Sequence, residues 1–118
     1  MAWTVLFHGE FDLEFEQFPE AVQDGLLVAV GVLRIYGPAL GRPHADTLAG
    51  SKFKNMKELR FFAGNGAWRV AFAFDTERQA IVLVAGDKSG VAQKRFYKSL
   101  IEKADARFAS HLRALKGD

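Results

Sequence analysis

The chain has 118 residues, the size of one ordinary domain, and 49% of them are hydrophobic while 25% are charged, as in a typical globular protein. It has no cysteine, which excludes disulfides and thiolate metal sites and is typical of a reducing cytosol. From its length we expect one domain over residues 1–118. The sequence has neither a run of about 18 apolar residues nor a basic signal-peptide start, so we expect no membrane contact and a cytoplasmic location.

The formal net charge of +2 is divided unevenly along the chain. Residues 1–41 carry six acidic residues against one basic residue, a balance of −5, whereas residues 42–118 carry fifteen basic against eight acidic residues, a balance of +7. This asymmetry predicts an acidic flank beside a basic working surface, which would attract a phosphate backbone. The alternative interpretation is that the charges only solvate the surfaces of helices.

The first third of the chain predicts one strand and two helices. Residues 2–8 are apolar and β-prone, which favours a strand. A helix is expected from residue 9 or 10 to about residue 18, because acidic residues lie in its first turns, where they favour the helix dipole. Pro19 ends that helix and can begin another, over residues 20–36, whose apolar residues recur at helical spacing until Gly37 ends it.

Residues 37–55 are rich in glycine and proline and predict one long loop, in which residues 44–48 could form a turn of helix. Three runs rich in β-branched and aromatic residues follow, at residues 56–62, 67–74 and 80–85, which predicts consecutive antiparallel strands. Because side chains alternate along a strand, the middle run has two unlike faces. Trp68, Val70, Phe72 and Phe74 form an apolar face suited to a core, and Arg69, Ala71 and Ala73 form a face that leaves room for something to lie there.

The end of the chain predicts a long helix over about residues 92–115, because apolar residues recur every four positions from Phe96 to Leu112. This helix would cover one face of the sheet. Its surface is expected to be basic, with Lys94, Arg95, Lys98, Lys103 and Arg107 on it. The predicted order is β-α-α-β-β-β-α, an α+β fold with a mostly antiparallel four-stranded sheet packed by helices.

Four features carry a resemblance to a known family: the element order, the segment Met56–Arg60, the segment Trp68–Val70, and a basic last helix after a strand that ends in Gly86-Asp87-Lys88. With these features nearly the whole chain resembles the RelE/ParE superfamily of bacterial toxins, in particular its phage-associated HigB-like branch. The resemblance implies a type II toxin–antitoxin system toxin, a ribosome-dependent mRNA endonuclease that inhibits translation. It also implies a helix-turn-helix antitoxin as partner, in a hetero-oligomer, with the ribosome and mRNA as targets.

RNA cleavage by the 2′-hydroxyl needs a base for its proton, positive charge on the phosphate and an acid for the leaving oxygen. The resemblance implies that Arg69 contacts the scissile phosphate, and Arg60 could donate to phosphate oxygens as a planar fork. Lys57 is a candidate for charge stabilisation, and Tyr97 for stacking on a base or transferring a proton. Further RNA-binding candidates are basic, namely Lys52, Lys54, Lys88, Lys94, Arg95 and Lys98.

These residues also have structural interpretations. Arg60 and Arg69 could simply pair with Glu58 across strands, and Lys57 could discourage edge-to-edge aggregation. RelE-like nucleases tend to have lysine where Glu58 stands, and no residue is an obvious general base, so two alternatives stay open: a non-enzymatic ParE-like inhibitor of DNA gyrase and a non-toxic binding module of the same fold. The three histidines show no ligand spacing, so neither a metal nor a cofactor is expected.

Overall fold

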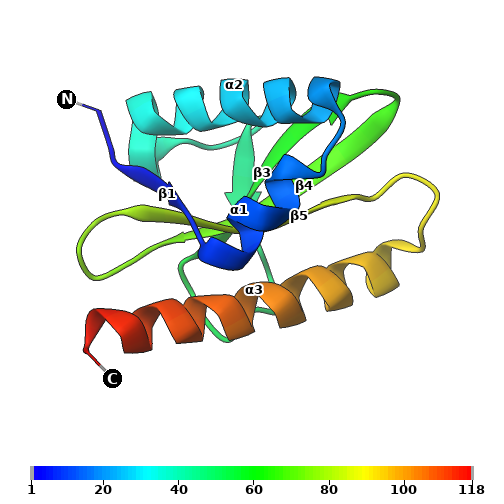
Figure 1. Ribbon diagram of the computed structural model, residues 1–118. Helices are drawn as coiled ribbons and strands as arrows, with labels where there is room; N and C mark the ends of the chain where they lie inside the picture. The colour runs from blue at the N-terminus through cyan, green and yellow to red at the C-terminus, as the bar shows by residue number, and fades with distance from the viewer. Residues whose placement is uncertain (1, 118) are drawn as a thin grey trace.

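One five-stranded sheet with helices on both faces organises the fold in the computed structural model, which describes residues 2–117 (Figure 1). The strands are β1 (Val5–Phe7), β2 (Ala45–Thr47), β3 (Met56–Ala63), β4 (Gly66–Phe74) and β5 (Ala80–Asp87). The helices are α1 (Gly9–Glu16), α2 (Glu20–Tyr36), the short 3-10 helix η1 (Gly37–Ala39) and α3 (Gln93–Leu115). Among the described residues, no helix combines the length and apolarity that a membrane span requires.

The sheet has the strand order β1-β5-β4-β3-β2, in which only the β1–β5 pair is parallel. The helices α1 and α2 follow β1 and lie in the connection that leads from β1 to its partner β5. A parallel pair requires such a long crossover connection. The predicted α+β class and the mostly antiparallel sheet are confirmed.

The fifth strand corrects the prediction for the loop. Residues 45–47, where a helical turn was considered, form β2, which pairs antiparallel with β3 so that Ala45 lies opposite Leu59. Ala45 is fully buried. Three residues are too few to show a period-2 pattern, and the strand exists only because its partner β3 lies beside it.

Both faces of the sheet are buried, each in its own core. On one face Val70 and Phe72 of β4 pack with apolar residues of α1 and α2, including Phe11 and Leu26. On the other face the small residues of β4 lie under α3. This helix therefore fills the room that the alanine face of β4 was predicted to leave. That second core comprises Ala71, Ala73, Ile81, Leu83, Leu100, Ala104 and Phe108, with Leu48, Met56 and Val84.

Arg107 joins α3 to α1 and to the sheet. Its guanidinium donates to both carboxylate oxygens of Glu14, at 2.8 and 2.5 Å, and to the backbone oxygen of Leu83 at 2.8 Å. The hydrogen bond from Arg107 lowers the pKa of Glu14. Arg107 is only 7% exposed, so the prediction that it decorates the helix surface is wrong. Its long side chain reaches back across the sheet edge, which helical periodicity alone does not reveal.

Asp75 closes the turn between β4 and β5. Its carboxylate accepts hydrogen bonds from the backbone nitrogens of Glu77 and Gln79, at 2.9 and 3.0 Å, and lies 2.7 Å from Nε2 of His111 on α3. Burial opposes ionisation of this group, but the hydrogen bonds from His111, Gln79 and Glu77 outweigh it, so the pKa of Asp75 is lowered. The ionised carboxylate therefore stabilises the turn and its contact with α3.

We expect Asp75→Asn to lower the free energy of unfolding at neutral pH by about 1–3 kcal/mol, because buried donors lose their acceptor. The melting temperature should fall accordingly. Since the folded pKa lies below the unfolded value of about 3.9, the contribution of ionisation is complete above about pH 4 to 5 and is lost as pH falls through the folded pKa. Thermal melts of both proteins from pH 7 to pH 3 test this. The gap between them should narrow below about pH 4, and a constant gap would contradict the assignment.

Candidate functional site

A buried carboxylate between two arginines lies on the face of the sheet that α3 covers. The register of β3 and β4 places Arg60 directly opposite Arg69, and Glu58 two residues before Arg60, so all three side chains share one face. Glu58 is only 4% exposed. Its carboxylate oxygens lie 3.5 Å from Nε of Arg60 and 4.0 Å from Nε of Arg69. Two like charges directly opposite would repel, so the carboxylate between them stabilises the arrangement.

Tyr97 completes the group from the first turns of α3. Its hydroxyl donates to Oε1 of Glu58 at 2.8 Å. Burial and the hydrogen bond to Glu58 raise the pKa of Tyr97, although Arg69 acts in the opposite direction. The hydroxyl is therefore protonated at neutral pH and able to act as a donor. Glu58, Arg60, Arg69 and Tyr97 are called the Glu58 cluster below.

Each arginine of the cluster has a buried donor. The Nε atoms of Arg60 and Arg69 are buried, and neither finds a hydrogen-bond partner among residues 2–117. Arg69 uses Nη1 to donate to the backbone oxygen of Trp68 at 3.0 Å. An unpaired buried donor costs about 1–3 kcal/mol, and a guanidinium is well suited to phosphate oxygens. The two Nε atoms face Glu58, and of the two guanidiniums it is that of Arg60 that lines the pocket, where it could donate to a phosphate.

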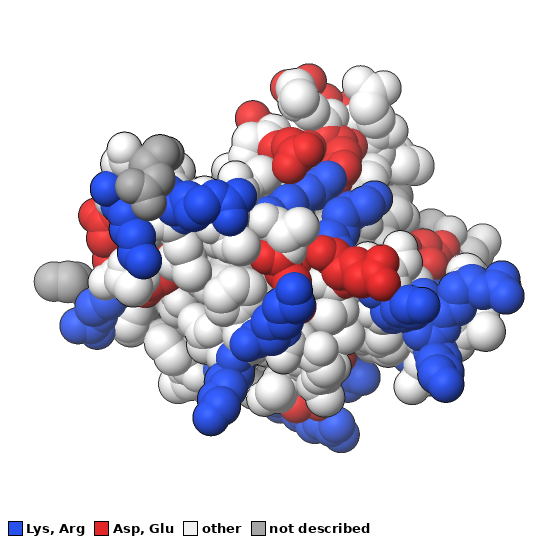
Figure 2. Space-filling view, turned by 90° about the horizontal axis from the view of Figure 1, so that it is seen from below, with Lys and Arg blue, Asp and Glu red and all other residues white. Residues whose placement is uncertain are grey.

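Glu58, Arg60 and Tyr97 form part of the wall of a pocket of about 690 Å³ between β2, β3 and the start of α3, whereas the buried Arg69 does not line it. Lys94 and Lys98 of α3 stand beside Arg60 on its rim, so cations outnumber the single carboxylate of Glu58. Seen from the side of α3, the molecule carries lysine and arginine side chains across its whole width, with acidic groups between them (Figure 2). The remaining lining residues are Thr47, Leu48, Ala49, Gln93, Tyr97 and Ile101.

The structure brings together some of the predicted site residues but not others. Arg60, Arg69 and Tyr97 form the cluster, and Lys94 and Lys98 flank it. Lys52 borders a neighbouring hollow that also includes Lys98. The other four predicted residues, Lys54, Lys57, Lys88 and Arg95, line neither space.

Lys57 is separated from the cluster by the alternation of β3. Its neighbours Glu58 and Arg60 share the face under α3, whereas Lys57 shares the other face with Leu59. Its Nζ donates to the backbone oxygen of Pro38 at 3.1 Å, beyond the end of α2. A direct contact between Lys57 and a phosphate held by Arg60 and Arg69 is therefore not supported by this geometry.

The residue that sequence reasoning underrated is Glu58, which the sequence presents only as a cross-strand partner of the arginines, at a position where related nucleases tend to have lysine. In the structure it is the centre of the cluster and the one carboxylate in the pocket wall. Strand alternation was the signal that could have grouped it with Arg60. Within residues 2–117 no group of three or more His, Asp or Glu residues is arranged to hold a metal ion.

The sheet topology, with a cationic pocket on the face under α3, defines the class as a RelE-type α+β domain. A solved structure of the E. coli toxin RelE, a double arginine-to-alanine variant in the free state, matches this chain with a TM-score of 0.61. The match covers 87% of this chain and 97% of that chain at 14% sequence identity, so it shows the fold alone. The RelE-like fold predicted from the sequence is confirmed.

Residues 13–109 match the family described as phage derived protein Gp49-like (DUF891), and the chain belongs to this family. It is 49% identical over 88 residues to the candidate toxin HigB2 of Mycobacterium tuberculosis. The aligned segment covers 74% of this chain but only 43% of HigB2. It is 45% identical over 89 residues to the candidate toxin HigB3 of the same organism, which covers 75% of each chain. The chain thus spans under half the length of one relative and three quarters of the other. The predicted resemblance to the HigB-like branch is confirmed.

Proposed function

We propose that the chain is the toxin of a type II toxin–antitoxin system and that it cleaves mRNA on the ribosome. The observation that carries the proposal is the Glu58 cluster, in which a buried carboxylate, two arginines and a protonated tyrosine meet, with Glu58, Arg60 and Tyr97 in the wall of one pocket. These are the groups that cleavage by a 2′-hydroxyl requires. Both HigB relatives are named as candidate toxins, which supports the toxin part of the proposal.

Each member of the cluster has a chemical role in this proposal. Glu58 takes the proton of the 2′-hydroxyl, whose oxygen then forms a bond to phosphorus. Arg60 and Arg69 donate to the phosphate oxygens, on which negative charge grows. The bond between phosphorus and the 5′ oxygen breaks, and the Tyr97 hydroxyl supplies a proton to that leaving oxygen. The products are a 2′,3′-cyclic phosphate and a 5′-hydroxyl, so no water, metal or cofactor is consumed.

An antitoxin of the helix-turn-helix type is the proposed protein partner, because toxins of this class are encoded with one. The outer face of α2 offers a surface for protein contacts, since Leu27, Val28 and Ile35 are 52%, 70% and 68% exposed. Contiguous exposed apolar side chains commonly mark such surfaces. We place the activity in the cytoplasm, where ribosomes and mRNA are found.

Mapping RNA 5′ ends by primer extension after brief expression of the wild type tests the proposal. We expect new ends within translated codons, which disappear when translation initiation is blocked beforehand. Intact mRNA in cells that stop growing would instead favour a gyrase inhibitor, with an SOS response as its signature. Intact mRNA and normal growth would leave a binding module of the same fold.

A further inference from the structure

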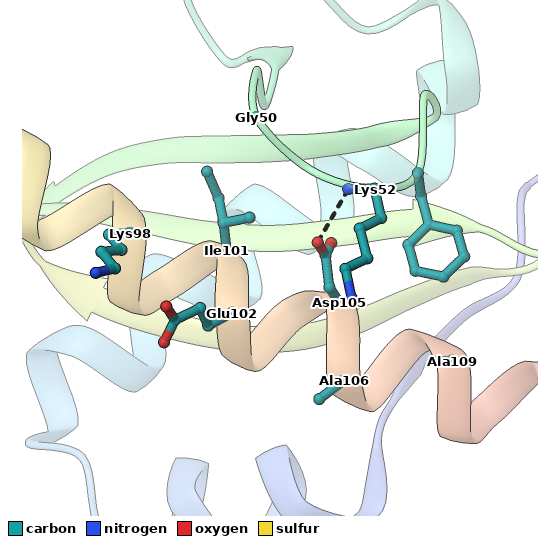
Figure 3. Close-up of a pocket in the computed structure, with 9 residues that line it drawn as sticks. Gly50, Lys52, Lys98, Ile101, Glu102, Asp105, Ala106 and Ala109 are labelled. Atoms are coloured by element: carbon teal, nitrogen blue, oxygen red, sulfur yellow. Dashed lines mark hydrogen bonds between the residues drawn. The ribbon is translucent and has the colours of Figure 1, made fainter.

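A second hollow lies beside the Glu58 pocket, between α3 and the loop that leads into β3 (Figure 3). It has a volume of about 450 Å³, which is within the range of small-ligand sites. Lys98 and Ile101 of α3 line both spaces, so the hollow continues the Glu58 pocket along the helix. A chain-like ligand could therefore occupy both at once.

The wall formed by the loop is fixed in place by Asp105 of α3. One carboxylate oxygen of Asp105 accepts from the hydroxyl of Ser51 at 2.5 Å. The other accepts from the backbone nitrogen of Lys52 at 2.9 Å, the contact drawn as a dashed line in Figure 3. The Ser51 oxygen in turn accepts from the backbone nitrogen of Phe53 at 3.0 Å. Both oxygens of the buried Asp105 are thus engaged, and the hollow is formed before any ligand arrives, which reduces the cost of binding.

The lining combines an apolar floor with two cations. Phe53 and Ile101 provide the larger apolar surfaces, and Ala106 keeps the space open because its side chain is small. The Phe53 ring packs edge-on against Phe108, with centroids 4.9 Å apart and planes at 87°, so its orientation is fixed. Lys52 and Lys98 are exposed at the rim. An aromatic surface beside cations is the combination that binds unpaired nucleotides, whose bases stack while their phosphates meet the lysines.

We propose that this hollow is a second nucleotide subsite, which holds the base of an unpaired RNA nucleotide adjacent to the phosphate that is cut at the Glu58 cluster. The inference rests on the proposed function and adds that this hollow helps to fix the position of the RNA relative to the Glu58 cluster. The base lies against Phe53 and Ile101, and the flanking phosphates lie near Lys52 and Lys98. Glu102, at the rim, disfavours a phosphate at its own position and can accept from an amino group on the base.

The experiment fills the hollow without touching the cluster. Ala106 lines this hollow and not the Glu58 pocket, and it is exposed on α3, so Ala106→Leu should fold normally. Ala114→Leu is the matched control, because Ala114 is exposed on the same helix and lines neither space. Primer extension on cellular RNA should show about tenfold less cleavage by Ala106→Leu and an altered distribution of cut sites, while Ala114→Leu resembles the wild type.

The outcomes separate this inference from the proposed function. Absence of cleavage by the wild type would overturn the proposed function and the subsite with it. Cleavage by the wild type, with Ala106→Leu giving the same yield and the same sites, would overturn the subsite alone. Unchanged cleavage combined with weaker neutralisation by the antitoxin would also overturn it, by assigning the hollow to a protein segment. If Ala106→Leu melts early, Lys52→Gln replaces it, because this variant removes a rim cation without filling the hollow and is expected to lower cleavage about threefold.

Discussion

Replacement of Arg69 by lysine is expected to reduce mRNA cleavage about 100- to 1,000-fold, the usual effect of removing one preorganised donor from a charge-stabilising site. Arg69 is 6% exposed, and its Nε faces Glu58 without a hydrogen-bond partner in the part of the chain that the structure describes. Arg69→Lys keeps the positive charge that compensates Glu58 but loses the planar set of donors. The rate of cleavage, measured by primer extension over a time course of expression, should fall while the melting temperature stays close to that of the wild type.

Arg34→Lys is the control for the chemical change itself. Arg34 is exposed near the end of α2, on the side of the sheet away from the cluster, and its replacement should leave cleavage unchanged. If Arg69→Lys kept the full cleavage rate, the arginine would be a structural partner of Glu58, as one interpretation of the sequence holds. If Arg69→Lys stopped growth with intact mRNA, the target of the toxin would have to be sought elsewhere.

Element boundaries were predictable wherever the chain carries strong local signals. Helix α2 begins after Pro19 and ends at Gly37, which has a positive φ of 56°, a conformation that glycine adopts readily. The three long strands followed from alternation, from the glycine-containing turn at residues 64–66 and from the polar break at residues 75–78. The strand β2 could not be predicted in this way, because its three residues are held by β3, which comes later in the chain.

Part of the site was also accessible from the sequence. Gly64 and Asn65 both have positive φ angles, of 52° and 67°, as in the two-residue turns that match the twist of a hairpin. Such a turn pairs Ala63 with Gly66, and counting three residues back along each strand brings Arg60 opposite Arg69. Because side chains alternate along a strand, the same count also gives the face of the sheet on which each side chain lies.

The sequence named Tyr97, Lys94 and Lys98 of α3 as candidates, but the position of α3 that brings them to the cluster was not accessible from it. The helical pattern predicted which side of α3 faces the sheet, but not its position along the sheet. That position decides whether Tyr97 reaches Glu58 or lies a turn away, and it depends on the packing of Phe108 and Leu100 against the alanines of β4. It also depends on Arg107 and Asp105, which hold α3 to α1 and to the loop before β3. These are long-range contacts between residues with no shared local pattern.

Replacement of Glu58 by glutamine is expected to reduce cleavage about 100- to 10,000-fold, because the 2′-hydroxyl loses its general base. The amide has the shape of the carboxylate and can still accept the hydrogen bond that Tyr97 donates. Two arginines would lose their counter-charge, so we also expect a loss of stability of about 1–3 kcal/mol. Cleavage should therefore be measured well below the melting temperature of the variant, and per amount of folded protein.

Two further variants distinguish a base from a structural anion. Glu58→Asp keeps a carboxylate one methylene further from the pocket, so it should recover part of the cleavage that Glu58→Gln loses. Glu20→Gln removes an exposed carboxylate at the start of α2, remote from the cluster, and should cleave like the wild type. If Glu58→Gln instead cleaved as fast as the wild type, or faster, Glu58 would only hold the arginines and repel the phosphate. The acceptor of the 2′-hydroxyl proton would then have to be sought among the other groups of the pocket wall, such as Tyr97, or on the ribosome, which holds the mRNA.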